Sequence, residues 1–391
     1  MSRNRFLAVL LLAVSLVCGP AAPPAGAWGA SAHMMLTTAA VDRMQGPVGD
    51  FFRANRHFLI CYSILPDSWW GSPELLGQLP KGLENPAGTN GPKELGRHHF
   101  AEDEEAYAES MPARSEARVV PLDRAQALEV FRKHVEKHGQ EALDRFRRQN
   151  SWFKGGLAEL PAAMLEKAGE LPWVIDERVN DMAAAMRSGN WVRAMLLATV
   201  LAHYVGDAHV PLHTTVNYNA QFHPNPLLKG LHQRWEGRII ELRKAEFRKF
   251  LRELIRSART PPAKMPSDPG ALRTAVFEMI ADTFSLTDDI LRVDDELLAH
   301  AGALGASPQP SKDRPDSGAY TPEYFRKFYE RLGPGIKGQL GRSVERITSL
   351  WGVAWERAGR PQPPTGNVET PPLVVIDFRN DRIVPYQPDR N

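Results

Sequence analysis

The feature that most constrains this chain is a set of histidines and carboxylates between His203 and Glu236. His203 and Asp207 are four residues apart, His232 and Glu236 are also four apart, and His213 lies between the two pairs. In an α-helix, side chains at positions i and i+4 lie on one face, a turn apart. Each pair can therefore offer an imidazole nitrogen and a carboxylate oxygen to one metal ion. Such ligands suit zinc best, although manganese and iron also accept them.

The helix expected to carry the first pair is strongly apolar. Asn190 can cap its start, and nearly every residue over 194–205 is apolar, so this helix is predicted to be buried on most sides. A carboxylate such as Asp207 is costly there unless it is paired or bound to a metal. The alternative to a metal is a mutual hydrogen bond between His203 and Asp207.

Pro211 is expected to end or kink this helix near Val210, because proline lacks the backbone donor that a helix needs. His213 then leaves the face of His203 and can turn toward a neighbouring metal. His209 lies roughly 240° around the helix from His203. It is therefore expected to pack or to support a ligand instead of binding a metal itself.

Further candidate ligands lie upstream. His33 is on the first turn of a predicted helix, Asp67 follows Pro66 at a helix end or turn, and His98 and His99 are adjacent. Each has an ordinary interpretation when taken alone: an exposed histidine, a turn aspartate and a solvated loop. Only their combination with the downstream histidines favours a metal site.

His134 and His138 form a third pair four residues apart. The order His-Val-Glu-Lys-His lacks the glutamate that directly follows the first histidine in a zinc-protease helix. Because lysines flank both positions, we expect a solvated helix face here instead of a metal site.

Apolar periodicity predicts an all-α chain: a single multi-helical domain built around a metal cluster, over residues 28–360. Ser31 is expected to cap the first helix, and Leu242 to lie in the buried stripe of a long amphipathic helix. An irregular, proline-rich tail follows over 361–391, with one candidate short strand. The main expected helices cover about 31–44, 120–150, 173–188, 191–210, 232–257, 269–302 and 321–358.

The first 27 residues have the pattern of a signal peptide. A basic start precedes the apolar run Phe6–Val17, and the small residues Ala25 and Ala27 occupy the positions that a signal peptidase reads. The apolar run is too short to span a bilayer. We therefore expect a mature protein that begins at Trp28 and is secreted or periplasmic.

Composition then excludes some classes of function. Removal of Arg3 and Arg5 lowers the basic count from 48 to 46, against 46 acidic residues, so the mature chain is nearly neutral. A broadly basic face for duplex nucleic acid is not indicated. Cys61 is the one cysteine that the mature chain keeps, so no internal disulfide is possible.

Several motifs between residues 28 and 236 act together. They are Trp28-Gly followed by His33, Pro-Asp67, His99 followed by an aromatic residue, His203-Tyr-Val-Gly-Asp207-Ala-His-Val-Pro-Leu-His213, and Leu-His232-Gln-Arg-Trp-Glu236. In these motifs the chain resembles the trinuclear-zinc superfamily, which unites bacterial zinc-dependent phospholipases C with fungal and plant single-strand nucleases. The block from His203 to His213 is the most specific of them.

The resemblance implies three zinc ions. Their ligands would be Asp67, His99 and His203 for the first, the Trp28 amino group and carbonyl with His33 for the second, and His213, His232 and Glu236 for the third. Asp207 would bridge the first two zincs, which the two oxygens of a carboxylate allow. Asp67 would also be catalytic, orienting or deprotonating the attacking water.

The implied activity is that of a zinc-dependent phosphodiesterase, in which a hydroxide bridging two zincs attacks phosphorus. The substrate would be a phospholipid head group or a single-stranded nucleic acid, with no obligate protein partner and a monomeric chain. Glu236 resembles the phospholipase branch, since nucleases usually have aspartate there. Thr-Thr-Val-Asn-Tyr-Asn over 214–219 replaces the Gly-Gly-Asn typical of nucleases. The alternative is a non-catalytic, secreted zinc-binding helical protein.

Overall fold

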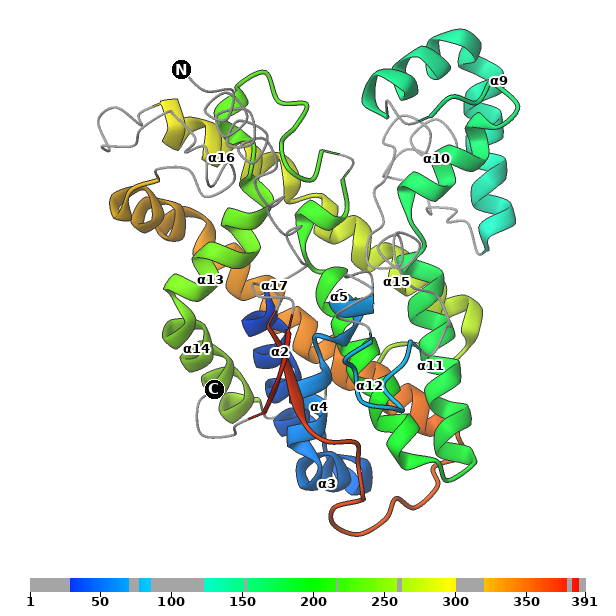
Figure 1. Cartoon of the computed structure of the whole chain (residues 1–391), viewed down its shortest axis with the longest axis vertical. Coiled ribbons are helices and arrows are strands. Elements are labelled where there is room, and N and C mark those ends of the chain that lie inside the picture. The colour runs from blue at the N-terminus through cyan, green and yellow to red at the C-terminus, as the bar shows by residue number, and fades with distance from the viewer. Residues whose placement is uncertain are drawn as a thin grey trace, which may run out of the picture.

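A computed structural model describes residues 29–69, 77–85, 123–150, 153–215, 217–258, 262–299, 320–377 and 382–386. Within these ranges the regular structure is almost entirely helical, which confirms the predicted all-α fold (Figure 1). None of the helices described there is both long and apolar enough to span a membrane.

Helices from both ends of the described chain build one core. In chain order they are α2 (Ala30–Arg43), α3 (Gly46–Ala54), α4 (Arg56–Tyr62), α5 (Leu65–Trp69), α9 (Arg124–Gln149), α10 (Leu160–Ala168), α11 (Leu171–Arg187), α12 (Trp191–Asp207), α13 (Ile239–Leu242), α14 (Lys244–Ser257), α15 (Pro269–Phe284), α16 (Thr287–Ala299) and α17 (Pro322–Arg357). Three short helical turns, η1 (Pro211–His213), η2 (Pro226–Leu228) and η3 (Gln233–Arg238), lie between α12 and α13.

Helix α12 is at the centre of this core. It packs against α2, α4, α5, α11 and α17, and every residue from Ala194 to Asp207 is buried. Figure 1 shows α17, in orange, running diagonally across the molecule behind α2 and α12. Trp351 of α17 donates a hydrogen bond to the Ala198 carbonyl at 3.0 Å. The predicted burial of α12 on most sides is therefore correct.

Helix starts follow the expected capping chemistry in some places only. The Asn190 side chain accepts a hydrogen bond from the Arg193 N–H at 3.1 Å and caps α12, as predicted. The prediction for Ser31 is wrong, because α2 begins at Ala30 after Gly29 and has no side-chain cap. The Ser31 hydroxyl accepts instead from Lys244 Nζ at 2.7 Å, which ties α2 to α14.

The segment after His232 is not one long helix. It begins with the π-helical turn η3 and continues as α13, and Arg243 (φ −119°) separates α13 from α14. Leu242, at the end of α13, is 46% exposed, so its predicted place in a buried stripe is wrong. The π-turn and the break at Arg243 each shift the helical phase, and a stripe counted at 3.6 residues per turn loses register there.

Helices α9 and α10 pack on each other and form a lobe at one end of the molecule in Figure 1, and their buried apolar residues continue the hydrophobic core. Gly139 has a positive φ of 50° and kinks α9, a conformation that glycine adopts without steric strain. His134 is only 3% exposed, with its ring centroid 4.5 Å from that of His138. The prediction of a solvated face is thus wrong for His134.

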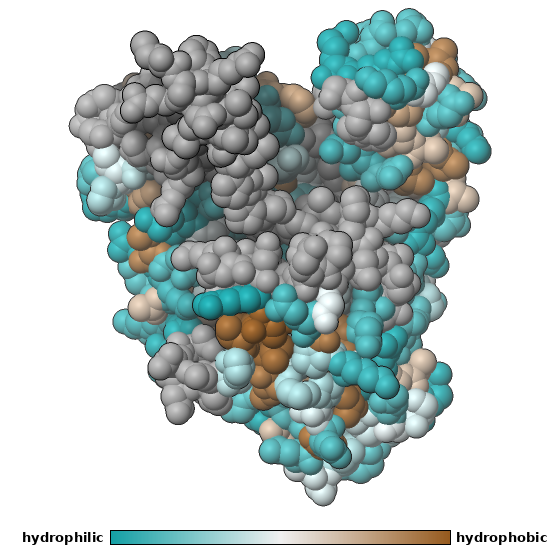
Figure 2. All heavy atoms as spheres, in the orientation of Figure 1, coloured by the Kyte–Doolittle hydropathy of each residue, from teal (hydrophilic) through white to brown (hydrophobic). Residues whose placement is uncertain are grey.

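The C-terminal tail contains two strands where one was predicted. β1 (Val374–Asp377) pairs antiparallel with β2 (Arg382–Pro385), with Val375 opposite Val384. The Tyr62 hydroxyl of α4 donates to the Pro372 carbonyl, and the Cys61 thiol donates to that of Val374. Burial raises the pKa of Cys61 to about 12. Figure 2 shows a hydrophobic area where the hairpin lies in Figure 1.

Candidate metal centre

The structure describes seven of the nine predicted ligands. Trp28 and His99 lie outside the described residues, as do the alternative ligand His98 and the predicted signal peptide. The seven described side chains are all buried and fall into two groups. The first ligand group comprises His33, Asp67, His203 and Asp207, and the second ligand group comprises His213, His232 and Glu236.

The first ligand group is built on regular helices. His33 comes from α2, Asp67 from α5, and His203 and Asp207 from successive turns of α12. Asp207 Oδ1 lies 3.4 Å from His33 Nε2, and its Oδ2 lies 3.3 Å from His203 Nε2. Asp67 Oδ1 is 3.5 Å from His203 Nε2. The Asp207 carboxylate thus presents one oxygen to each histidine.

A backbone contact of His203 and a ring contact between His203 and His33 orient these two imidazoles. His203 Nδ1 donates to the Ser63 carbonyl at 2.7 Å, which leaves Nε2 as the nitrogen that faces the carboxylates. The His33 ring stacks on the His203 ring at 3.7 Å with an 11° interplanar angle. A Cβ at Gly206 would approach the His33 ring to 3.3 Å, so glycine gives His33 the room to pack here.

The second ligand group is built on irregular backbone. His213 is in η1, which begins at Pro211 as the chain leaves α12, and Glu236 is in η3, directly after His232. His213 Nε2 lies 2.8 Å from His232 Nε2 and 3.0 Å from Glu236 Oε2. His232 Nε2 and Glu236 Oε2 are also 3.0 Å apart. Pro211 therefore redirects His213 toward this pair.

The two groups adjoin. His213 Nδ1 is 3.6 Å from Asp207 Oδ1, while its Nε2 faces His232 and Glu236. Each group contains three buried side chains whose ligand atoms lie within 4.8 Å of one another, so each could hold a metal ion.

Electrostatics also favour a cation. Burial alone lowers the pKa of His203, but Asp207 and Asp67 more than compensate and raise it to about 10. Burial raises the pKa of Glu236 to about 7, although the neighbouring His232 opposes this shift. Among the described residues, Asp67 Oδ1 is buried with no hydrogen bond, its polar neighbour being His203 Nε2 at 3.5 Å. Buried carboxylates in this arrangement are stabilised by a bound cation.

The two ligand groups differ in the distances between their donor atoms. Tetrahedral zinc with bonds of 2.0–2.1 Å places its donor atoms about 3.3 Å apart. The contacts of His33 and His203 with the carboxylates of the first ligand group, at 3.3–3.5 Å, fit this directly. The 2.8–3.0 Å contacts of the second ligand group are shorter and also suit hydrogen bonds. This group must open by a few tenths of an ångström to hold tetrahedral zinc.

His209 lies outside both groups, as predicted, although α12 ends at Asp207 and not near Val210. Its Nδ1 donates to the Val205 carbonyl at 2.7 Å and so satisfies one of the last carbonyls of α12. Burial lowers the pKa of His209 to about 4. This histidine caps the helix that presents Asp207.

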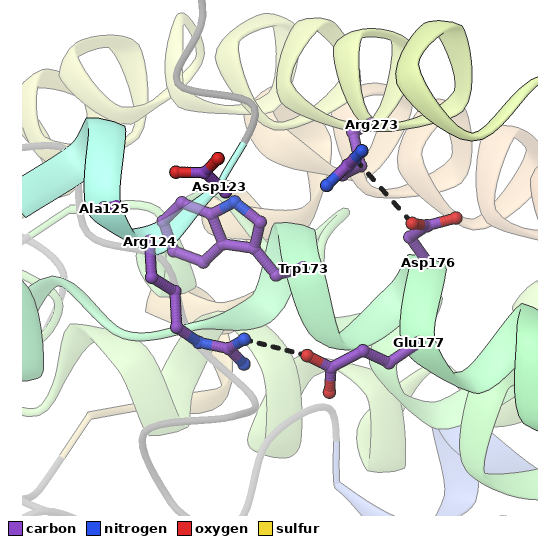
Figure 3. Close-up of a pocket in the computed structure, with 7 residues that line it drawn as sticks. All are labelled: Asp123, Arg124, Ala125, Trp173, Asp176, Glu177 and Arg273. Carbon is purple, nitrogen blue, oxygen red and sulfur yellow. Dashed lines mark hydrogen bonds and ion pairs between the residues drawn. The ribbon is translucent and has the colours of Figure 1, made fainter.

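A cavity of about 290 Å³ lies elsewhere, between the start of α9 and helices α11 and α15 (Figure 3). Arg124 reaches Glu177 across it at 2.8 Å, and Arg273 lies 3.7 Å from Asp176. Its charged side chains therefore largely compensate one another, and the metal centre is the stronger candidate site. The lining residues are Asp123, Arg124, Ala125, Trp173, Asp176, Glu177 and Arg273.

Sequence reasoning missed Arg234, which lies between His232 and Glu236 and is 2% exposed. The signal for it in the sequence was its position, two residues from each of the predicted ligands His232 and Glu236. No protein-family model matches this chain, and the search of curated proteins found no match.

Proposed function

We propose that this protein is an exported, zinc-dependent phosphodiesterase that hydrolyses phosphate esters. One observation carries the proposal: ligand-type side chains from widely separated segments converge, buried, around the Asp207 carboxylate. The convergence of histidines and carboxylates without thiolate favours zinc among biological metals. Export follows from the predicted signal peptide over residues 1–27.

Three zinc ions would use the two ligand groups together with Trp28 and His99. Asp207 would be shared by two of them, since its two oxygens face His33 and His203 separately. When bound, zinc would lower the pKa of a coordinated water toward 7 and stabilise negative charge on the phosphate oxygens.

The residues of the chain itself would supply orientation and proton transfer. The Ser63 carbonyl holds His203 in the tautomer that presents Nε2. Asp67 would orient the attacking water or accept its proton, because its Oδ1 faces the same space as His203 Nε2. No serine or cysteine nucleophile is needed, and the Cys61 thiol donates to the Val374 carbonyl instead.

The substrate is a phospholipid head group or a single-stranded nucleic acid. Tyr218 is 44% exposed, and its ring lies edge-on to His232 with centroids 5.6 Å apart, at the rim of the second ligand group. An exposed aromatic ring there could stack on a base or contact a cationic head group.

The test begins with naturally exported protein, so that its terminus is processed in the cell. Zinc per chain is measured by mass spectrometry, and one preparation is assayed on single-stranded DNA, RNA, phosphatidylcholine and a chromogenic phosphodiester. We expect at least two zincs per chain and hydrolysis of one class of substrate. Fewer than two zincs, or no hydrolysis of any of the four, would contradict the proposal.

The same preparation tests the non-catalytic alternative. Bound zinc without hydrolysis, and with every coordination position filled by protein, would favour a structural role, because catalytic zinc keeps an open position.

A further inference from the structure

The Arg234 side chain lies at the centre of a buried polar network behind the second ligand group. All three of its guanidinium nitrogens are engaged. Nε contacts the Tyr324 hydroxyl at 3.1 Å, Nη1 contacts that of Tyr320 at 2.9 Å, and Nη2 pairs with Asp294. The Tyr324 hydroxyl also donates to Asp294, so Arg234, Asp294 and Tyr324 each contact the other two.

The same guanidinium holds the backbone that leads into the ligand turn. Arg234 Nη1 donates to the Lys229 carbonyl and Nη2 to the Leu228 carbonyl, both at 3.0 Å. The Tyr320 hydroxyl donates to the Leu227 carbonyl at 2.8 Å. Arg234 therefore joins the segment before His232 to α16, which carries Asp294, and to the start of α17.

The position of Arg234 in the turn connects this network to the metal ligands. It is two residues from His232 and two from Glu236, so in a helical turn its side chain points to roughly the opposite side from theirs. Its backbone lies between theirs in η3, a π-helical turn. Such turns are rare and are frequently found at functional sites. The arginine holds this turn from the side opposite to the ligands.

We propose that Arg234 is a positioning residue for metal binding by His213, His232 and Glu236. By anchoring η3 to α16 and α17, it sets where two of the three donor atoms stand. The inference rests on the proposed function only because it assumes that the second ligand group binds a metal. Phosphodiester hydrolysis is not required for it.

Arg234→Lys is the decisive variant, because lysine keeps the charge but cannot form the forked contacts of a guanidinium. Zinc affinity is measured by competition with a chelating dye, and Glu236→Gln identifies which binding step belongs to the second ligand group. Loss of a supporting residue around a metal ligand typically lowers affinity about 10- to 100-fold. Glu236→Gln should abolish one zinc-binding step. We expect Arg234→Lys to lower the zinc affinity of that same step about 10- to 100-fold and to leave the affinities of the other steps unchanged.

Arg357→Lys is the matched control. Arg357 also joins two helices: its Nη1 contacts Asp176 at 3.1 Å and Asn180 at 2.7 Å on α11, but it lies at the opposite end of α17 from Tyr324. This variant should retain every zinc-binding step. Unchanged affinity in Arg234→Lys, or equal weakening of all steps in it, would overturn the proposal.

A milder variant decides the question if Arg234→Lys does not fold. Tyr320→Phe removes one hydroxyl contact of the guanidinium and retains the aromatic ring, whose centroid lies 4.4 Å from Arg234 Cζ. We expect it to weaken the same step by a smaller factor, about threefold. Equal weakening of every step, or none, would again contradict the proposal. These experiments measure zinc affinity and do not require hydrolytic activity. The hydrolysis assays can therefore contradict the phosphodiesterase hypothesis without affecting this test.

Discussion

The two ligand groups reach similar chemistry through different backbone. The first ligand group stands on α2, α5 and α12, regular helices whose side chains the core holds on most sides. The second stands on a 3₁₀ turn and a π-helical turn that follow the end of α12. Its shape depends on Pro211 and on the network around Arg234 more than on helical periodicity.

The difference is visible in donor spacing. Contacts from the two histidines to the carboxylates in the first ligand group match the separation that tetrahedral zinc requires, whereas those in the second are shorter by a few tenths of an ångström. A site on regular helices is preorganised, and a site on irregular turns must be held by other side chains. The predictions below test whether this contrast governs metal binding.

The largest expected effect comes from Asp207→Ala, because Asp207 contacts His33, His203 and His213. We expect loss of at least one zinc per chain and a fall in kcat of about 1,000-fold, the scale of losing one major electrostatic stabiliser of the transition state. Metal analysis and steady-state hydrolysis measure the two effects. Full zinc content in Asp207→Ala would show that the carboxylate does not join the groups.

A smaller effect is expected when zinc is removed from the unaltered chain. One site filled at 100 times its dissociation constant stabilises the folded state by about 2.7 kcal/mol. A graded chelator titration, followed by zinc content and urea unfolding, should release zinc from the second ligand group first. Simultaneous release of zinc from both groups would show that the difference in donor spacing does not make their zinc affinities different.

The smallest effect concerns His209, a buried histidine beside the cluster. His209→Ala removes the side-chain donor to the Val205 carbonyl and should lower the free energy of unfolding by about 1 kcal/mol. Zinc content should be unchanged, because His209 belongs to neither group. His203→Ala is the matched comparison and should lose zinc. If both variants lost the same zinc, His209 would have to be counted among the ligands.

The sequence predicted the regular part of this molecule well, and for a physical reason. An apolar helix with a capping asparagine, such as that after Asn190, is specified by local residues, and the i,i+4 spacing of His203 and Asp207 follows from it. Pro211 likewise predicts the change of direction before His213. These features account for the placement of His203, Asp207 and His213 among the seven predicted ligands that the structure describes.

The remaining features depend on contacts that local sequence does not encode. The single π-turn η3 departs from the 3.6-residue period of an α-helix, and Leu242 is misassigned because that turn and the break at Arg243 change the phase. His134 is buried although lysines flank it, in a lobe formed by the packing of α9 with α10. Trp28 and His99 lie outside the described residues, and their roles stay predictions.

The most direct test of a metal centre around Asp207 is X-ray diffraction from crystals grown with zinc, measured on both sides of the zinc absorption edge. We predict anomalous peaks about 2.0–2.2 Å from the donor atoms of both ligand groups. Those in the second ligand group should lie between His213 Nε2, His232 Nε2 and Glu236 Oε2, with these atoms moved slightly apart. Absence of a peak at either group, with His213 and His232 still within hydrogen-bonding distance, would contradict the account.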